Sequence, residues 1–456
     1  MAKEAHPDWP QEALELIAEL RREIAELRRR LAEAERGQKR QAAPFSKGAP
    51  KSEPAKPGRK TGANYGAYRQ RSRPKRVDEV IDVPAPRRCP DCGGTVDEGV
   101  VHDQFQTELP VVEPRVVQFR VGIGVCRHCG GRVQGRHPRQ TSDALGAAHN
   151  QIGPRALAVA AQLNKVYGLS YVKVAAAFGQ LFGMDVVPST FVRGFERLAV
   201  RIKPAYGDIT LAVRRAPIVY PDETGWRVAG RLGWLWVFVS PNATLYVIRP
   251  SRGFDVIEEI LGSDYAGQIG HDGWAPYDQL TAATHQTCLA HILRRCNHLL
   301  EGAMRGAARF PHAIKDAVKD ALALRDRRHE ISAHGMAVAT GKLQARFNRL
   351  VEWQPTWDPN RKLAKHLRNH RDELLTFLRH PGLEATNWPS EQAIRPAVVN
   401  RKVFGGNRTW KGAQTQEILT SIFQTARNRG VTAVDFLASC LRTPPNMSLP
   451  VLASGP

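Results

Sequence analysis

The stretch Val219-Tyr220-Pro221-Asp222-Glu223-Thr224-Gly225-Trp226 carries a short apolar run into an acidic, glycine-containing segment. Three β-prone runs follow one another from here, joined by tight turns: residues 218–220, 234–239 and 245–248. A helical segment over 254–261 and a fourth strand over 267–270 come next. The pattern predicts the order β-β-β-α-β for this region, within an α+β multidomain protein.

Three acidic residues occupy settings that are typical of metal ligands: Asp222, Asp272 and Glu391. Asp222 and Asp272 each follow a predicted strand, the second in Ile269-Gly270-His271-Asp272-Gly273-Trp274. Glu391 falls in the first turn of a segment that begins like a helix at Asn387. If the two strands are neighbours, the three carboxylates can bracket two Mg²⁺ or Mn²⁺ ions about 3.5–4 Å apart. We predict that all three are catalytic metal ligands at a phosphodiester.

Each of these acids also has an ordinary structural explanation. Asp222 or Asp272 alone is compatible with capping a turn, because aspartate is common in loops. Glu391 alone is compatible with a helix N-terminus and an ion pair with Arg395 one turn later. The order and flanks of the three together favour metal binding, with Glu223 as a reserve ligand and Asp278 as a weaker one.

The composition favours a polyanionic partner. The 456 residues include 66 Lys and Arg against 44 Asp and Glu, which gives a net charge of +22. Nucleic acid is the main candidate and an anionic membrane surface is the alternative. No apolar run approaches the ~18 residues that span a bilayer, and the charged start lacks a secretory apolar segment. We therefore expect a cytoplasmic protein of two to four domains that binds double-stranded DNA and no membrane.

Two CxxC pairs predict one structural zinc ion. They are Cys89-Pro90-Asp91-Cys92 and Cys126-Arg127-His128-Cys129, with 33 residues between them. Four thiolates suit tetrahedral Zn²⁺, and the glycine after each second cysteine permits a tight turn. The Val- and Phe-rich run over 107–125 predicts the strands of a zinc-ribbon DNA-binding domain over 81–140. A disulfide pair is the weaker alternative, because nothing suggests secretion.

Residues 1–36 carry the stripe of a short coiled coil. Its apolar residues alternate spacings of three and four: Ile17, Leu20, Ile24, Leu27, Leu31 and Ala34. Packing on the rest of the protein is the alternative, but we expect a homo-oligomer. Residues 37–80 read as a basic disordered linker, since 37–76 hold 12 Lys or Arg and one acid. Such a linker adds sequence-independent affinity for DNA.

Residues 141–205 have the pattern of a helical domain similar to a helix-turn-helix. Helical runs at 155–163 and 171–182 precede a third helix after Pro188. The sequence Gly183-Met184-Asp185 is a candidate turn, so Arg193 and Arg197 on the next helix are candidate DNA contacts. A plain helical segment that packs on the following domain is the alternative.

The 119 positions from Asp272 to Glu391 exceed what one connection needs, and predict a helical insertion over 285–385. Helical periodicity marks four segments: 285–300, 313–328, 336–351 and 362–378. Arg294 and Arg295 on the first are candidate contacts to the DNA backbone. A second zinc site is disfavoured, because its candidate ligands fan around a helix beside two arginines: His285, Cys288, His291, Cys296 and His298.

The segment after Glu391 is basic and contains glycine. Pro396 predicts a kink or an end of the first helix, because it removes an N–H and crowds the preceding turn. A second helix is expected from about residue 414. Five cations in this region are candidate phosphate contacts, with an ordinary solvated loop as the alternative: Arg395, Arg401, Lys402, Arg408 and Lys411.

On these residues the chain resembles the insertion sequence 66 family of DDE transposases. The resemblance rests on four motifs: Asp-Glu-Thr-Gly-Trp at 222–226, His-Asp-Gly-Trp at 271–274, Glu-Gln-Ala-Ile-Arg-Pro at 391–396 and Asn-Arg-Lys at 400–402. It covers the chain from the zipper to about residue 437. The sequence Asn-Trp-Pro-Ser at 387–390 departs from the family's usual Asn-Asn and small spacer.

The resemblance implies a ribonuclease H-like catalytic core over 206–284 and 386–440, with Asp222, Asp272 and Glu391 as its metal ligands. It also implies a helical insertion that contacts DNA, and small accessory proteins encoded beside the transposase. The expected function is a DNA transposase that cleaves the ends of its element and joins the 3′ ends to target DNA. A metal-dependent nuclease without joining and a zinc-containing DNA-binding regulator are the alternatives. Residues 441–456 are expected to form a tail.

Overall fold

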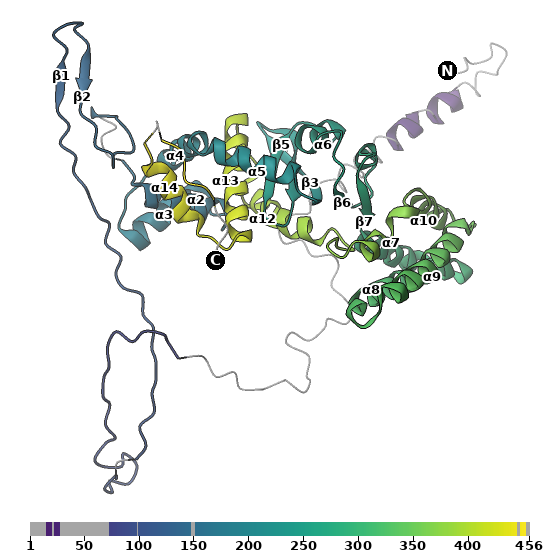
Figure 1. The fold of residues 1–456 in the computed structure, drawn as a ribbon, viewed down its shortest axis with the longest axis horizontal. Coiled ribbons are helices and arrows are strands. Elements are labelled where there is room, and N and C mark those ends of the chain that lie inside the picture. The colour runs from purple at the N-terminus through teal and green to yellow at the C-terminus, as the bar shows by residue number, and fades with distance from the viewer. Residues whose placement is uncertain are drawn as a thin grey trace. The chain divides into compact units, whose positions relative to one another are not determined.

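The computed structural model describes residues 15–20, 22–27, 73–97, 99–146, 151–444 and 447–452 (Figure 1). The chain divides into two compact units, residues 1–113 and 114–456. Leu31 and Ala34 of the predicted zipper lie outside the described residues, as do most of the predicted linker and the last residues of the tail.

The first unit contains helical residues at 15–20 and 22–27. Four large apolar side chains are exposed along this helical segment: Leu16, Leu20, Ile24 and Leu27. They include three residues of the predicted coiled-coil stripe. A helix is thus present where one was expected, and its pairing with a second copy stays a prediction.

The second unit is built on a five-stranded mixed sheet of order β5-β4-β3-β6-β7. The strands are β3 (Ile218–Val228), β4 (Arg231–Val239), β5 (Thr244–Arg249), β6 (Gln268–His271) and β7 (Thr284–Thr287), with α6 (Phe254–Leu261) between β5 and β6. The three strands β3, β4 and β5 pair antiparallel, while β6 runs parallel to both β3 and β7. The chain is therefore an α+β protein, as predicted.

Two details of the sheet differ from the prediction. Asp222 lies inside β3 rather than after it, because β3 continues in an antiparallel hairpin with β4 as far as the pair Val228 and Arg231. The predicted start of the first insertion helix, at His285, was wrong, because α7 begins at Leu289. Residues 284–287 form β7, since their backbone pairs in parallel with β6 from Gln268 to His271.

Each face of the sheet is covered by helices. On one face, Trp226, Val237 and Tyr246 form a core with Ala393 and Ile394 of α12 (Trp388–Phe404). On the other face, alternate residues of the same strands share a core with two further helices: α5 (Lys203–Arg214), which was not predicted, and α6. The period-two alternation of the strands thus supplies both apolar layers.

The helix α12 continues through Pro396, so this proline does not end it. Ala393 and Ile394 before the proline and Ala397 after it are all buried against the sheet. Packing on both sides of Pro396 therefore outweighs the cost of the missing hydrogen bond.

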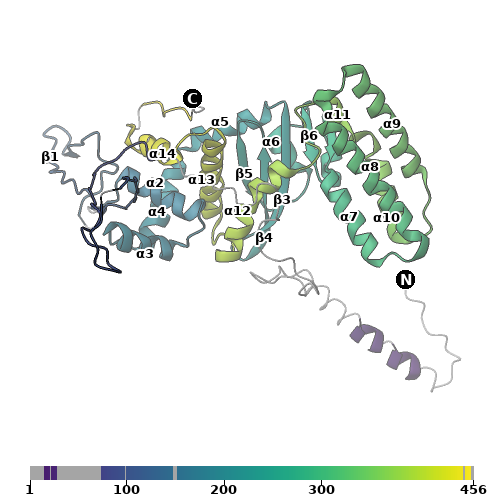
Figure 2. The same cartoon turned by 90° about the horizontal axis from the view of Figure 1, so that it is seen from below.

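A helical layer lies at the β5 end of the sheet (Figure 2). It contains α2 (Pro154–Lys165), α3 (Tyr171–Phe182), α4 (Pro188–Arg201), α13 (Trp410–Asn428) and α14 (Ala433–Arg442). The chain turns between α3 and α4 at Gly183, whose φ of 61° is left-handed and favours glycine. Phe178 of α3 packs edge-on against Phe191 of α4, with ring centroids 5.1 Å apart. The helices predicted here are therefore present.

The insertion forms a helical bundle at the β7 end of the sheet (Figure 2). Its helices are α7 (Leu289–Gly302), α8 (Arg309–Asp326), α9 (Ala333–Glu352), α10 (Asp358–Asn369) and α11 (Thr376–Arg379). The bundle has its own apolar core, which includes Leu289, Phe347 and Leu367. The helix expected over 362–378 is interrupted between Asn369 and Thr376, and the Phe377 N–H in the first turn of α11 donates to Gln286 Oε1 of β7 at 2.9 Å.

Between residue 73 and α2, the described residues contain little regular structure. Two short strands, β1 (Ile123–Val125) and β2 (Arg132–Gln134), pair antiparallel around the second CxxC pair. Only the last three residues of the run 107–125 are in a strand, so the prediction of strands along its length was wrong. The side chains of Val111, Val116 and Ile123 are exposed, so apolar composition here does not correspond to a buried strand.

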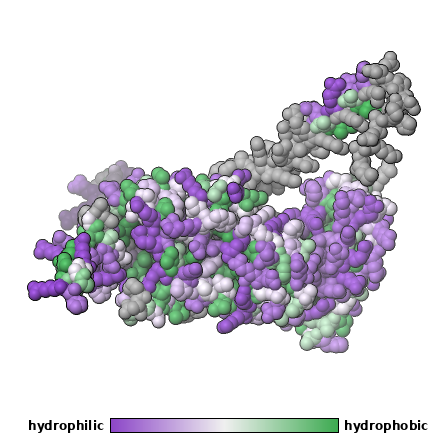
Figure 3. Space-filling model, turned by 90° about the horizontal axis from the view of Figure 1, so that it is seen from above, coloured by the Kyte–Doolittle hydropathy of each residue, from purple (hydrophilic) through white to green (hydrophobic). Residues whose placement is uncertain are grey.

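Hydrophobic residues are scattered among hydrophilic ones on the face of the molecule drawn in Figure 3. Single exposed apolar residues are normal on protein surfaces and need no membrane or partner to explain them. Of the helices that the structure describes, none has the length and apolar character to cross a bilayer.

Candidate active site

Asp222 and Asp272 come from the two neighbouring parallel strands at the centre of the sheet. Ile218 pairs with Gln268 and Val219 with Ile269, so the register between β3 and β6 has an offset of 50 residues. The same offset separates Asp222 from Asp272, which directly follows β6. The backbone register thus brings Asp222 and Asp272 to matching positions on neighbouring strands.

Glu391 approaches these residues from the start of α12. Asn387 precedes this helix, and its side-chain Nδ2 donates to Pro221 O at 2.8 Å, one residue before Asp222. The Asn387 N–H also donates to the Sγ of Cys288, just before α7, at 3.1 Å. Asn387 therefore fixes the start of the Glu391 helix to β3 and to the insertion, a role that the sequence reasoning missed.

The three carboxylates lie close enough to affect one another electrostatically. Burial, followed by the neighbouring charge of Glu223, raises the pKa of Asp222 to about 7, and the charges of Asp272 and Glu391 add to the rise. The Asp222 Oδ1 accepts a hydrogen bond from the Glu223 N–H at 2.9 Å, and this bond opposes the rise in pKa. The negative charges of these partly buried carboxylates repel one another. A divalent cation bound by their oxygens would relieve this repulsion.

The triad is open rather than tightly closed. Among the described residues, two groups have ligand atoms that all lie within 4.8 Å of one another, and neither contains Asp222, Asp272 or Glu391. Carboxylates that bracket two ions about 3.5–4 Å apart need a wider arrangement than those around a single ion.

Glu391 faces a histidine and an arginine of the insertion. Its Oε1 lies 3.8 Å from the Nε2 of His291 and 3.6 Å from an Nη2 of Arg294, both on α7. The alternative partner Arg395 is exposed on α12 and makes no such pair in the described structure. The first helix of the insertion therefore contributes charge directly beside the triad.

The reserve ligand Glu223 has other partners. Its carboxylate accepts hydrogen bonds from Arg252 Nε at 2.9 Å and from the Tyr277 hydroxyl at 2.9 Å. The guanidinium of Arg252 in turn stacks on Trp274, 4.1 Å from the ring centroid. Because its negative charge is neutralised within this network, Glu223 is better suited to holding the strand edge than to binding an ion.

A buried histidine cluster lies beneath Asp272 and was also missed from the sequence. His271 Nδ1 accepts the Gly273 N–H at 3.1 Å, and its Nε2 lies 3.0 Å from His285 Nδ1. His285 Nε2 in turn lies 2.9 Å from Leu280 O, a bond in which the ring must donate. Burial lowers the pKa of His271 to about 3, so the ring is neutral. With every ring nitrogen engaged, the pair orients the Asp272 turn and has no free lone pair for a metal.

The insertion reaches this turn through α10 and the residues after it. Glu373 accepts hydrogen bonds from the Thr287 hydroxyl at 2.6 Å and from His370 Nδ1 at 3.2 Å. Gly273 has a φ of +83°, and a Cβ at this position would lie 2.7 Å from His366 Cε1. The turn after Asp272 therefore needs glycine both for its backbone and for the close approach of α10. Asp278 joins His370 and Glu373 in a cluster rather than the triad.

A cavity of about 440 Å³ opens beside Asp272. Trp274, His291, Arg294, Arg295 and His366 are among the residues that line it. Arg294 and Arg295, predicted to contact the DNA backbone, thus lie at the acidic site itself. A cationic cavity next to carboxylates suits a phosphate group whose reacting bond faces the acids.

The remaining candidate cations are in different environments. Arg193, Arg197, Arg395, Lys402 and Arg408 are exposed.

By contrast, Arg401 donates from Nη1 to Thr224 Oγ1 at 2.9 Å and also to Gly225 O, so it holds α12 to β3. Lys411 Nζ pairs with Glu196 at 2.6 Å. Arg401 is therefore less available to DNA than the other candidates, whereas Lys411 is exposed and held only by a surface ion pair.

The two CxxC pairs fold into matching turns. The Cys89 N–H donates to Gly94 O at 2.8 Å and the Cys126 N–H to Gly131 O at 2.8 Å. Gly93 and Gly130, which follow the second cysteines, have φ of 73° and 71°. Hydrogen bonds from the backbone at Cys92 and Cys129 lower the pKa of the Cys89 and Cys126 thiols, respectively. All four cysteines are free thiols, so each turn is suited to metal binding.

A family model, described as Transposase IS66 family, matches residues 149–415, more than half of the chain. The uncharacterized protein y4qI of Sinorhizobium fredii is 24% identical over 409 residues, which cover 80% of this chain and 72% of that protein. The uncharacterized protein y4jO of the same organism is 24% identical over 185 residues, 40% of this chain and 53% of that protein.

The mixed sheet, the carboxylates at one of its edges and the family match define the class of this protein, which is a transposase. The chain belongs to the Transposase IS66 family, and the family predicted from the sequence motifs is confirmed.

Proposed function

We propose that this transposase cleaves and joins DNA with two divalent metal ions held by Asp222, Asp272 and Glu391. The observation that carries the proposal is that the charges of Asp272 and Glu391 both act on the Asp222 carboxyl, while the strand register sets Asp222 and Asp272 side by side. The sheet order β5-β4-β3-β6-β7 supports a ribonuclease H-like core. The donor set fits Mg²⁺ or Mn²⁺, since both prefer carboxylate oxygens.

Bound ions at such a site activate the attacking hydroxyl and stabilise the leaving oxygen. In the cleavage step the oxygen of water bonds to phosphorus, the bond from phosphorus to the 3′ oxygen breaks, and a 3′-hydroxyl is freed. In the joining step that hydroxyl bonds to a target phosphorus and displaces the target strand's 3′ oxygen, so no outside oxidant or energy source is required. Arg294 and His291 lie beside Glu391, where they can hold the phosphate oxygens.

Replacing Asp222 with Asn tests this proposal. We expect both nicking and joining to be abolished on labelled element ends in Mg²⁺, with end binding nearly unchanged. The exposed Asp264, after α6, supplies the control Asp264→Asn, which should remain active. Surviving cleavage in the Asp222→Asn protein would overturn the metal-ligand assignment.

The same assay separates the alternatives. Cleavage without transfer to an unlabelled target duplex identifies a nuclease. Binding without any metal-dependent cutting identifies a DNA-binding regulator with an inert triad. The charges of Asp272 and Glu391 that act on Asp222 favour a metal-dependent enzyme over the regulator, and the family match favours the transposase over the nuclease.

We further propose that Cys89, Cys92, Cys126 and Cys129 bind one structural Zn²⁺. The matching turns and free thiols of the two pairs support this. Homo-oligomer formation through the exposed apolar stripe of the N-terminal helix is a related proposal. Metal content of the purified protein should show about one zinc per chain, and a Cys126→Ser variant should lose it.

A further inference from the structure

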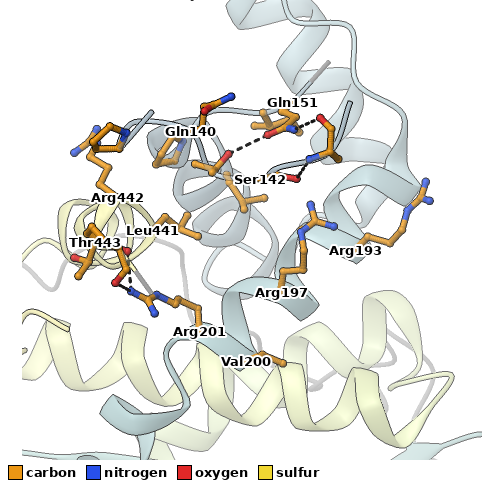
Figure 4. Close-up of a pocket in the computed structure, with 18 of the residues that line it drawn as sticks. Gln140, Ser142, Gln151, Arg193, Arg197, Val200, Arg201, Leu441, Arg442 and Thr443 are labelled. Atoms are coloured by element: carbon orange, nitrogen blue, oxygen red, sulfur yellow. Dashed lines mark hydrogen bonds between the residues drawn. The ribbon is translucent and has the colours of Figure 1, made fainter. Parts of the chain in front are cut away.

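A pocket of about 1000 Å³ lies away from the acidic triad, between α4, residues 136–144 and 151–154, and the end of α14 (Figure 4). None of Asp222, Asp272 and Glu391 lines it. Figure 4 shows Arg197 projecting from α4 toward the segment that carries Ser142, Arg193 beside it on the same helix pointing outward, and Arg442 on the opposite side.

The pocket is strongly cationic. Five arginines line it and no acidic residue does: Arg136, Arg193, Arg197, Arg201 and Arg442.

The acids closest in the chain are all paired. Asp143 pairs with the pocket residue Arg136 at 2.8 Å, whereas Asp435 pairs with Arg155 at 2.5 Å and Glu196 with Lys411 at 2.6 Å, outside the pocket. Asp143 therefore offsets the charge of Arg136, and within the described residues no carboxylate pairs with the other four arginines.

Three of the five arginines are available to a ligand. Arg201 is not, because it donates to Thr443 O at 2.7 Å and to Pro444 O at 2.9 Å, which fastens α4 to the chain after α14. Arg136 is held by Asp143. Arg193 makes only long contacts, at 3.4 Å, to its own-helix neighbour Ser189.

Arg197 and Arg442 donate no side-chain hydrogen bond to any other residue that the structure describes. Arg193 and Arg197 lie one helical turn apart on the same face.

The chemistry of this set matches phosphate. A guanidinium is always charged and binds a phosphate through two parallel N–H groups, so arginine is preferred over lysine for this purpose. The two glutamines that line the pocket are engaged: Gln151 Nε2 donates to Ala144 O at 3.3 Å, and Gln140 Oε1 accepts the His137 N–H at 2.6 Å. The pocket therefore offers charge, while the amide side chains that would read adenine already have partners.

We propose that this arginine pocket binds the sugar-phosphate backbone of DNA independently of sequence, at a site separate from the catalytic carboxylates. The inference rests on the proposed function only in taking DNA as the substrate. Because element ends and target DNA present the same phosphates, the pocket should bind both equally and hold DNA that extends beyond the reacting phosphodiester.

The test compares the full-length protein with the double variant Arg193→Ala/Arg197→Ala. Fluorescence anisotropy measures binding to two 30-base-pair duplexes, one with the element's terminal repeat and one of unrelated sequence. We expect affinity for both duplexes to fall at least about tenfold at low salt, and the slope of log K against log salt to decrease by about 2. The lysine pair Arg193→Lys/Arg197→Lys should keep the salt slope and lose part of the affinity.

A control removes two exposed cations from the ends of α5, Lys203→Ala/Arg215→Ala, and should leave the binding of both duplexes unchanged. Unchanged affinity in the Arg193/Arg197 variant, an equal loss in the control, or no DNA binding by the unmodified protein would each overturn the proposal. A loss confined to the terminal repeat would overturn its sequence independence. Cutting by the unmodified protein and by Asp222→Asn is measured separately, so failure of the catalytic proposal is distinguishable from failure of this one.

Discussion

Lys165, at the end of α2, is a cation buried without a carboxylate partner. Its Nζ donates to Gln416 Oε1 at 2.7 Å and lies 5.8 Å from the ring centroids of Tyr171 and Phe195. Burial lowers the pKa of this lysine from 10.5 to about 7. Between those values the unfolded chain binds a proton that the folded chain does not, so stability rises as the pH rises through this window.

Replacing Lys165 with Met should remove that dependence. The unmodified protein should gain stability between about pH 7 and pH 10 relative to the variant, because only its unfolded state carries the extra proton there. Chemical unfolding across this range measures the difference, and the exposed Lys342→Met serves as the control. Parallel stability curves for the Lys165→Met and unmodified proteins would show that the Lys165 ammonium is not destabilised in the fold.

At the scale of elements, the contact between the start of α12 and β3 determines where Glu391 lies relative to Asp222. Asn387→Ala removes the hydrogen bond to Pro221 O and leaves the helix itself intact. One lost hydrogen bond costs about 1 kcal/mol, so the protein should still fold. Displacement of the carboxylate by about 1 Å should nevertheless slow nicking by roughly 100-fold. Single-turnover nicking rates test this, with Asn369→Ala on α10 as the control; equal rates would remove Asn387 from the positioning of Glu391.

Elements with a strong apolar period were predictable, and those set by distant partners were not. The helix predicted over 254–261 has the same bounds as α6. Its buried face consists of Val256, Ile257, Ile260 and Leu261, whose helical spacing is visible in the sequence. By contrast, β7 reads Thr-His-Gln-Thr, and only pairing with β6 makes it a strand. The three acids were found from their flanking motifs, whereas Asn387 and the histidine cluster depend on contacts across about a hundred residues of sequence.

On the scale of the whole second unit, the insertion has an apolar core of its own, distinct from the two cores that cover the faces of the sheet. It nevertheless contributes His291 and Arg294 to the acidic site and Glu373 to the turn after Asp272. Activity should therefore depend on the bundle even where the sheet stays folded.

Leu367→Ala tests this dependence, because Leu367 is fully buried in the bundle core. Truncating a buried leucine costs about 2–5 kcal/mol, enough to open a small bundle. Hydrogen exchange should show lost protection in α7 to α10 with β3 to β5 still protected, together with loss of nicking. The reciprocal variant Leu245→Ala, in the core beside α5 and α6, should first expose the strands. Simultaneous loss of protection in both regions with either variant would mean that the bundle and the sheet unfold as one cooperative unit.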